Sequence, residues 1–144
     1  MVGGFETVRD VIDCELRKKI EDHFYIRFND EFTHNVVPFY ASMDIITLPT
    51  RREGFGLTLI EAAAMELPTI ASRVTGCVDA VVDGITGLLV EVDNSEQFYL
   101  AMLKLANEPD LRKKLGQQGR KRVAQLFDSK TLIQKHIELY DGLL

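Results

Sequence analysis

Asp44-Ile-Ile-Thr-Leu-Pro-Thr-Arg-Arg-Glu-Gly-Phe-Gly-Leu-Thr-Leu-Ile-Glu-Ala-Ala-Ala-Met65 is the stretch of sequence that decides the fold. Residues 44–49 are a β-branched, apolar run, which is typical of a strand buried inside a parallel sheet. Residues 58–65 are rich in alanine and leucine, which favour a helix. A loop with two glycines joins the two segments, so this stretch predicts a strand, a loop and a helix in direct succession.

The same alternation of strands and helices continues on both sides of this stretch. Strands separated by helices imply βαβ units and a parallel sheet, so we expect an α/β fold in a single domain, residues 1–144. Ser95 is the expected N-cap of the helix that follows it. The remaining predicted strands are 24–28, 68–72 and 88–92, and the remaining predicted helices are 13–23, 35–42, 76–82, 95–106, 109–127 and 130–143.

The predicted sheet is small for this architecture. A doubly wound sheet normally has more strands, and the chain opens on Gly3-Gly4, a pair typical of the loop that follows a strand. A sheet without its first strand would leave one edge unpaired. We therefore expect the N-terminal strand to be missing and the chain to be part of a larger protein.

Composition excludes several classes of function. The net charge of −5 argues against a nucleic-acid-binding protein, which would carry the opposite balance. The spacing of Cys14 and Cys77 matches no zinc pattern, and the three histidines are scattered, so we expect no metal site. No signal peptide and no apolar run long enough to span a membrane are visible, so we expect a cytoplasmic protein.

The loop after the strand at 44–49 is the candidate binding site. Ligands of open α/β sheets bind at the carboxyl ends of the strands, which is where this loop lies. Gly54 and Gly56 allow a ligand to approach the backbone closely. The amides of Gly56, Leu57 and Thr58 would point out of the helix N-terminus, and together with the helix dipole they favour a phosphate.

Two carboxylates frame this predicted anion site. Glu53 lies in the loop and Glu61 in the helix, roughly 7–8 Å along the helix axis from Gly56. Carboxylates accept hydrogen bonds from hydroxyl groups, so a diphosphate flanked by a sugar and a ribose fits the arrangement. A purely structural explanation also fits, because a glutamate early in a helix stabilises the dipole and Gly-x-Gly loops are common turns. Spacing alone leaves both explanations open.

Glu53-Gly-Phe-Gly-Leu-Thr-Leu-Ile-Glu61 resembles the Glu-x7-Glu motif of retaining glycosyltransferase family 4, whose members have two Rossmann-like domains. The segments that flank the motif also match, and we identify the chain by this resemblance as the C-terminal, donor-binding half of such an enzyme. The match is especially close to members that build capsular or lipid-linked polysaccharides. The residues carrying it are 40–49, 60–65, 67–68, 72–90, 108–112 and the final Leu-Tyr-Asp-Gly-Leu-Leu.

The resemblance implies a Rossmann-like parallel sheet flanked by helices and a role for each residue of the motif. Glu61 would accept hydrogen bonds from the ribose of the donor, and Glu53, the candidate catalytic residue, would contact the transferred sugar. The other donor-binding residues would be Gly54, Phe55, Gly56, Leu57 and Thr58, most of them through backbone amides. The reaction would transfer a hexose or N-acetylhexosamine, with retention, from a UDP-sugar or other nucleoside-diphosphate sugar to a polysaccharide or lipid-linked acceptor. The family needs no metal or other cofactor.

The chain departs from the family in three respects. The N-terminal acceptor domain is missing, and so are the upstream Arg and Lys that usually neutralise the diphosphate, so we expect no activity from these residues alone. Glu66 stands where members often have Gly. Because a residue other than glycine in a left-handed cap costs on the order of 1 kcal/mol, we expect this helix to end differently.

Several basic residues have two interpretations. Arg51, Arg52 and Arg73 either neutralise donor phosphates or are solvated surface charges. A basic cluster either forms the solvated face of a helix or makes peripheral contact with an anionic membrane at its inner surface; it comprises Arg112, Lys113, Lys114, Arg120, Lys121 and Arg122.

Two other functions compete with a donor-binding half. The alternative from another class is a non-catalytic half-domain that complements or regulates a separately encoded glycosyltransferase half. A nucleotide-sugar epimerase of the same fold is a further alternative, and the two glutamates of the motif argue against it.

Overall fold

A computed structural model describes residues 14–26 and 35–143, which fall into two units divided after Val36. The first contains helix α1 (Cys14–Glu21). The strand predicted at 24–28 is wrong for residues 24–26, and its last two residues lie outside the described ones. The amide of Ile26 donates to the carbonyl of His23 at 3.0 Å and closes a turn there, which an extended strand would not allow.

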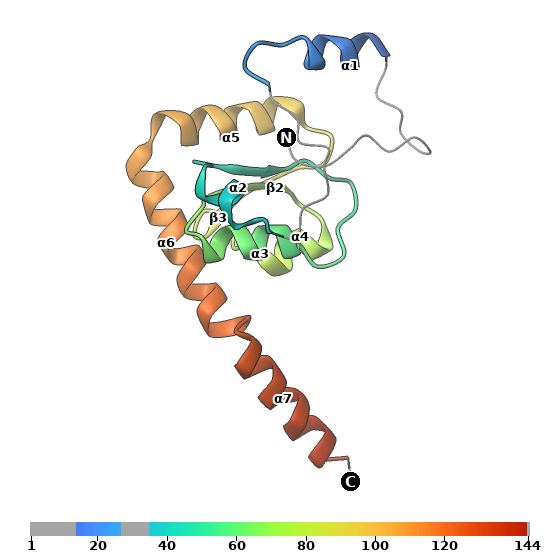
Figure 1. Cartoon of the computed structure of the whole chain (residues 1–144), viewed down its shortest axis with the longest axis vertical. Coiled ribbons are helices and arrows are strands. Elements are labelled where there is room, and N and C mark those ends of the chain that lie inside the picture. The colour runs from blue at the N-terminus through green and yellow to red at the C-terminus, as the bar shows by residue number, and fades with distance from the viewer. Residues whose placement is uncertain (1–13, 27–34, 144) are drawn as a thin grey trace. The chain divides into compact units, whose positions relative to one another are not determined.

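The second unit alternates strands and helices as predicted (Figure 1). The predicted Ser95 N-cap is wrong, because the side chain of Asn94 accepts the hydrogen bond from the Gln97 amide at 2.9 Å. Ser95 is instead the first residue of its helix. The elements are α2 (Val37–Ala41), β1 (Ile46–Leu48), α3 (Leu57–Ala64), β2 (Thr69–Ser72), α4 (Thr75–Ala80), β3 (Gly87–Val90), α5 (Ser95–Asn107), α6 (Pro109–Leu126) and α7 (Ser129–Asp141).

The strands form a parallel sheet in the order β1-β2-β3. The described residues contain three of the four predicted strands. Helix α5 covers one face of the sheet, and α3 with α4 covers the other (Figure 1). On the α5 face, Ile70 and Val90 pack with Leu105 of α5 and Leu115 of α6 into a core cluster. The expected Rossmann-like parallel sheet flanked by helices is therefore confirmed.

Helix α6 crosses from α5 to α3 and packs closely on the end of α3. Gly116 makes this possible, because a side-chain carbon at that position would overlap the carbonyl oxygen of Glu66. The contact fixes the C-terminal end of α3, and with it the direction in which α3 presents its first turn.

The prediction that Glu66 would end α3 differently is wrong. Glu66 adopts the left-handed conformation, with φ of 61°. Its amide donates to Ala63 and the amide of Leu67 donates to Ala62, both at 3.0 Å, which is the Schellman arrangement. These two hydrogen bonds satisfy the last carbonyls of the helix and offset the strain of the β-carbon.

Replacing Glu66 with glycine should therefore stabilise the protein. We expect Glu66→Gly to raise the free energy of unfolding by about 0.5–1 kcal/mol, because the relief of left-handed strain exceeds the added entropy of the unfolded chain. Urea denaturation measures the change. The matched control is Glu66→Ala, which keeps the β-carbon and also removes the exposed Glu66–Arg120 contact at 3.7 Å. Equal stability of the two variants would contradict the left-handed assignment.

Candidate functional site

The loops that follow the three strands are tied together at one edge of the sheet. The amide of Thr50, just after β1, donates to the Ser72 hydroxyl at the end of β2 at 3.0 Å. The Nε of Arg51 donates to Oδ1 of Asp93, after β3, at 2.9 Å. The loop carrying Glu53 therefore lies at the carboxyl edge of the sheet, where ligands of open α/β folds bind.

This loop, residues 49–56, is packed against the first turn of α4. The amide of Gly76 donates to the carbonyl of Glu53 at 3.2 Å. A β-carbon at Gly76 would lie 2.6 Å from that carbonyl oxygen and 2.7 Å from the Phe55 nitrogen, so only glycine fits. Gly56 begins α3 with φ of 69°, which also favours glycine. Two glycines thus fix where the loop stops and α3 starts.

The side chain of Glu53 turns back onto its own loop. Its Oε1 accepts hydrogen bonds from the amides of Phe55 at 3.3 Å and Gly56 at 3.1 Å. Two of the amides predicted to hold the ligand therefore contact a carboxylate here. No acceptor among the described residues contacts the amides of Leu57 and Thr58, and both residues are exposed. This end of α3 is thus partly capped and partly open.

Glu61 lies on the same face of α3 as the side chains of Leu57 and Thr58, since it follows Thr58 by three residues and Leu57 by four. It is half-buried, and its Oε2 accepts a hydrogen bond of 2.8 Å from the hydroxyl of Tyr40 in α2. The structure therefore brings Glu53, Glu61 and the first turn of α3 together.

Sequence reasoning missed the role of Tyr40. The tyrosine lies within the matching segment 40–49, but no spacing rule connects it to Glu61, and only the tertiary fold brings the two together. Tyr40 is 7% exposed. Its burial, followed by the hydrogen bond to Glu61 and the negative charge of that carboxylate, raises the pKa of the Tyr40 hydroxyl well above its usual value.

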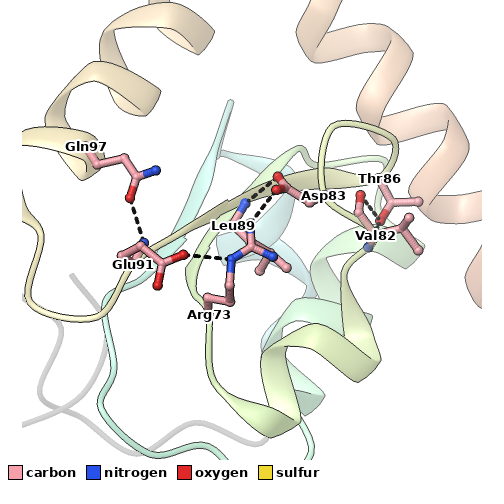
Figure 2. Close-up of polar contacts among 7 residues, drawn as sticks. All are labelled: Arg73, Val82, Asp83, Thr86, Leu89, Glu91 and Gln97. Atoms are coloured by element: carbon pink, nitrogen blue, oxygen red, sulfur yellow. Dashed lines mark hydrogen bonds and ion pairs between the residues drawn. The ribbon is translucent and has the colours of Figure 1, made fainter.

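Arg51 and Arg73 both have carboxylate partners, as solvated structural charges would. Arg51 pairs with Asp93. Arg73 bridges Glu91 at 3.0 Å and Asp83 at 2.5 Å and so connects the ends of β2 and β3 (Figure 2). Burial raises the pKa of Asp83, but the hydrogen bonds from the Leu89 amide and from Arg73 outweigh it and lower the pKa overall. Arg52 is exposed in the site loop.

The basic cluster on α6 is only partly free of structural contacts. Arg112 donates to the carbonyl of Leu105 at 2.6 Å and so caps the end of α5. Arg122 donates to the carbonyl of Asp79 in α4 at 3.0 Å, and Arg120 lies near Glu66. The three lysines of the cluster, Lys113, Lys114 and Lys121, are exposed.

Other chemistry near the site is sparse. Cys77 is fully buried behind the loop. Burial, followed by the charge of Glu53, raises the pKa of its thiol, so the reactive thiolate is disfavoured.

Within residues 14–26 and 35–143, no group of histidine, cysteine or acidic side chains is placed to hold a metal ion. In the same part of the chain, no helix combines the length and apolar character needed to cross a bilayer.

Comparison with known proteins identifies the family. Residues 2–122 match the family described as glycosyl transferases group 1, and the chain belongs to that family. It is 40% identical to the capsular polysaccharide biosynthesis glycosyltransferase CapM of Staphylococcus aureus over 100% of this chain and 37% of that protein. The chain therefore spans a little over a third of the length of this relative.

Solved structures agree with the fold. Sucrose-phosphate synthase from Thermosynechococcus elongatus superposes with a TM-score of 0.83 at 30% identity, over 99% of this chain and 37% of that chain. The C-terminal domain of a glycosyl transferase group 1 family protein from Francisella tularensis superposes with a TM-score of 0.72 at 29% identity, over 80% of this chain and 62% of that one.

The hydrogen bond between Tyr40 and Glu61 should contribute to stability. We expect Tyr40→Phe to lower the free energy of unfolding by about 1.5 kcal/mol, the usual loss for a hydrogen bond to a charged group. Because the folded state raises the pKa of Tyr40, this contribution is complete below about pH 10 and is lost as the pH rises further. Denaturation of both proteins across this range measures it. Tyr99→Phe, at an exposed position of α5, is the matched control, and an equal effect there would refute the assignment.

The contacts of Asp83 should make stability depend on acid pH. Since its pKa lies below the ordinary value of 3.8, its contribution is present above that pH and disappears as the pH falls through the lowered pKa. We expect Asp83→Asn to cost about 1 kcal/mol at about pH 7, a value reduced by partial exposure, and progressively less as the pH falls below 3.8. Asp79→Asn, at an exposed position of α4, should cost little in either pH range. A pH-independent effect of Asp83→Asn would count against the ion pair.

Proposed function

We propose that this chain is the C-terminal, donor-binding half of a retaining glycosyltransferase. It would bind a nucleoside-diphosphate sugar, with UDP as the first nucleotide to test, and present a hexose or N-acetylhexosamine for transfer. The observation that carries this proposal is the arrangement at the start of α3. Glu53 caps the chain just before α3, Glu61 lies one turn into that helix, and the two open amides lie between them in the sequence, at the carboxyl edge of a parallel sheet.

Each group of the site has a role that its chemistry supports. The amides of Leu57 and Thr58 would donate to the diphosphate, and the dipole of α3 would stabilise the charge that develops as the bond to the sugar breaks. Glu61 would accept hydrogen bonds from ribose hydroxyls through Oε1, because Tyr40 already occupies Oε2. The Tyr40 contact also leaves the carboxylate with one preferred orientation.

Glu53 would contact the transferred sugar. Its present hydrogen bonds to Phe55 and Gly56 are long, at 3.3 and 3.1 Å, so a sugar hydroxyl can share the same carboxylate. Bond cleavage at the anomeric carbon would release the diphosphate toward the α3 amides. The acceptor hydroxyl oxygen would then form the new bond to the anomeric carbon on the same face of the sugar, with retention, and its proton would pass to the departing diphosphate oxygen. No metal or other cofactor enters this proposal.

The rest of the enzyme lies in the part of the relatives that this chain does not span. We propose that an N-terminal half supplies the acceptor site and the basic side chains that neutralise the diphosphate, so the present residues alone would not catalyse transfer. The apolar side chains of α7 favour a protein contact of this kind, since Ile133 and Tyr140 are 60% and 65% exposed. The same surface would serve a half-domain that complements a separately encoded partner.

The resemblance to capsular enzymes suggests where the protein acts. We propose a cytoplasmic protein that uses a polysaccharide or lipid-linked acceptor. Its peripheral contact with an anionic membrane would use Lys113, Lys114 and Lys121, the members of the basic cluster without structural contacts.

Isothermal titration with UDP and UDP-sugars tests donor binding. We expect the wild-type chain to bind UDP with a Kd of about 1 mM, and Glu61→Gln to raise that Kd about tenfold or more through loss of the charged acceptor. Glu53→Gln should leave the Kd for UDP unchanged and raise the Kd for the UDP-sugar. Glu96→Gln, in the first turn of α5, makes the same charge change and should alter neither.

Two results would overturn the proposal. One is the absence of heat beyond buffer dilution for the wild-type chain at millimolar ligand. The other is a Glu61→Gln variant that binds UDP as tightly as the Glu96→Gln control.

A further inference from the structure

The site loop also contacts the far end of α6, some seventy residues along the chain. The ring of Phe55 packs edge-on against the ring of Phe127, with centroids 5.8 Å apart and an interplanar angle of 79°. Phe127 is the C-cap of α6, and its amide donates to Val123 at 2.9 Å. Phe55 lies in an exposed loop and is 51% exposed, but its ring contacts a residue at the end of a regular helix.

Phe127 also contacts a second residue of known partners, Arg122. The guanidinium of Arg122 lies over the Phe127 ring, 5.9 Å from its centroid. The same guanidinium donates to the carbonyl of Asp79 near the end of α4 at 3.0 Å. Helix α4 in turn contacts the loop through Gly76 and Glu53 at its first turn. The loop is therefore held at two points. Glu53 contacts α4 through its carbonyl, and Phe55 contacts Phe127 through its ring.

We propose that Phe127 is a positioning residue for Glu53 and acts through Phe55. The Phe55 amide donates to Oε1 of Glu53, so a displacement of Phe55 also displaces the acceptor that its amide and the Gly56 amide share. The proposal rests on the proposed function, in which Glu53 contacts the transferred sugar. Phe127 then determines how well the sugar is held, while Glu61 and the open amides of α3 hold the nucleotide.

The proposal predicts that loss of the Phe127 ring affects the binding of UDP and of a UDP-sugar differently. Loss of the Phe127 ring should weaken binding of the sugar moiety and leave binding of the nucleotide unchanged. An edge-to-face aromatic contact of this kind corresponds to roughly a three- to tenfold change in an equilibrium constant. A general loss of stability would instead weaken UDP and UDP-sugar binding by the same factor.

The experiment compares wild type with Phe127→Leu, which keeps an apolar side chain and removes the ring. Titration with UDP, UDP-glucose and UDP-N-acetylglucosamine gives the Kd values, and NMR hydrogen exchange follows the Gly56 amide without any ligand. We expect Phe127→Leu to raise the Kd of the better-binding UDP-sugar by roughly three- to tenfold, with no change for UDP, and to speed Gly56 exchange by a similar factor. Phe127→Tyr should restore both values.

Two further variants complete the design. Phe55→Leu tests the same contact from the exposed side, and in that background Phe127→Leu should have no additional effect. Tyr99→Leu removes an exposed ring on α5 and should change nothing. Equal loss of UDP and UDP-sugar binding in Phe127→Leu, or unchanged Gly56 exchange, would overturn the positioning role. A wild-type chain that binds none of the three ligands would overturn the proposed function and this role with it.

Discussion

The site depends on the close approach of two backbone segments, the loop after β1 and the first turn of α4. Their contact leaves no space for a β-carbon at Gly76, and the amide of that glycine donates to the carbonyl of Glu53. Because Gly56 turns the chain into α3 immediately afterwards, the same contact determines where the open amides of α3 lie relative to Glu53. A side chain at Gly76 would move the loop and separate these groups.

Glu53 occupies in this structure a position that suits an anion. Its carboxylate accepts hydrogen bonds from two backbone amides at the start of a helix, where the helix dipole favours negative charge. A diphosphate would find similar donors one and two residues further along, at Leu57 and Thr58. The carboxylate thus holds the loop in its present shape while the next amides remain open. In the proposed function the backbone amides of α3 would hold the diphosphate without Arg51 and Arg73, because both arginines are paired with carboxylates.

Local sequence was sufficient for most of the secondary structure and for placing the loop and the helix start that carry the candidate site, and insufficient for the tertiary contacts around them. The β-branched run at 44–49 and the alanine-rich segment after it define β1 and α3 through strong local preferences. The strand expected at 24–28 is absent at its described residues because the chain turns at His23 and Ile26. Glu66 shows the opposite effect, since two backbone hydrogen bonds at the end of α3 hold it in a conformation that its residue type disfavours. The Tyr40–Glu61 and Phe55–Phe127 contacts join residues far apart in sequence, so no local pattern could reveal them.

A crystal structure of the chain with UDP tests the central claim most directly. The account predicts phosphate oxygens within hydrogen-bonding distance of the Leu57 and Thr58 amides, and a ribose hydroxyl on Glu61 while Tyr40 keeps its contact with the other carboxylate oxygen. A nucleotide bound at another edge of the sheet, or one bound at α3 with its ribose directed away from Glu61, would contradict it.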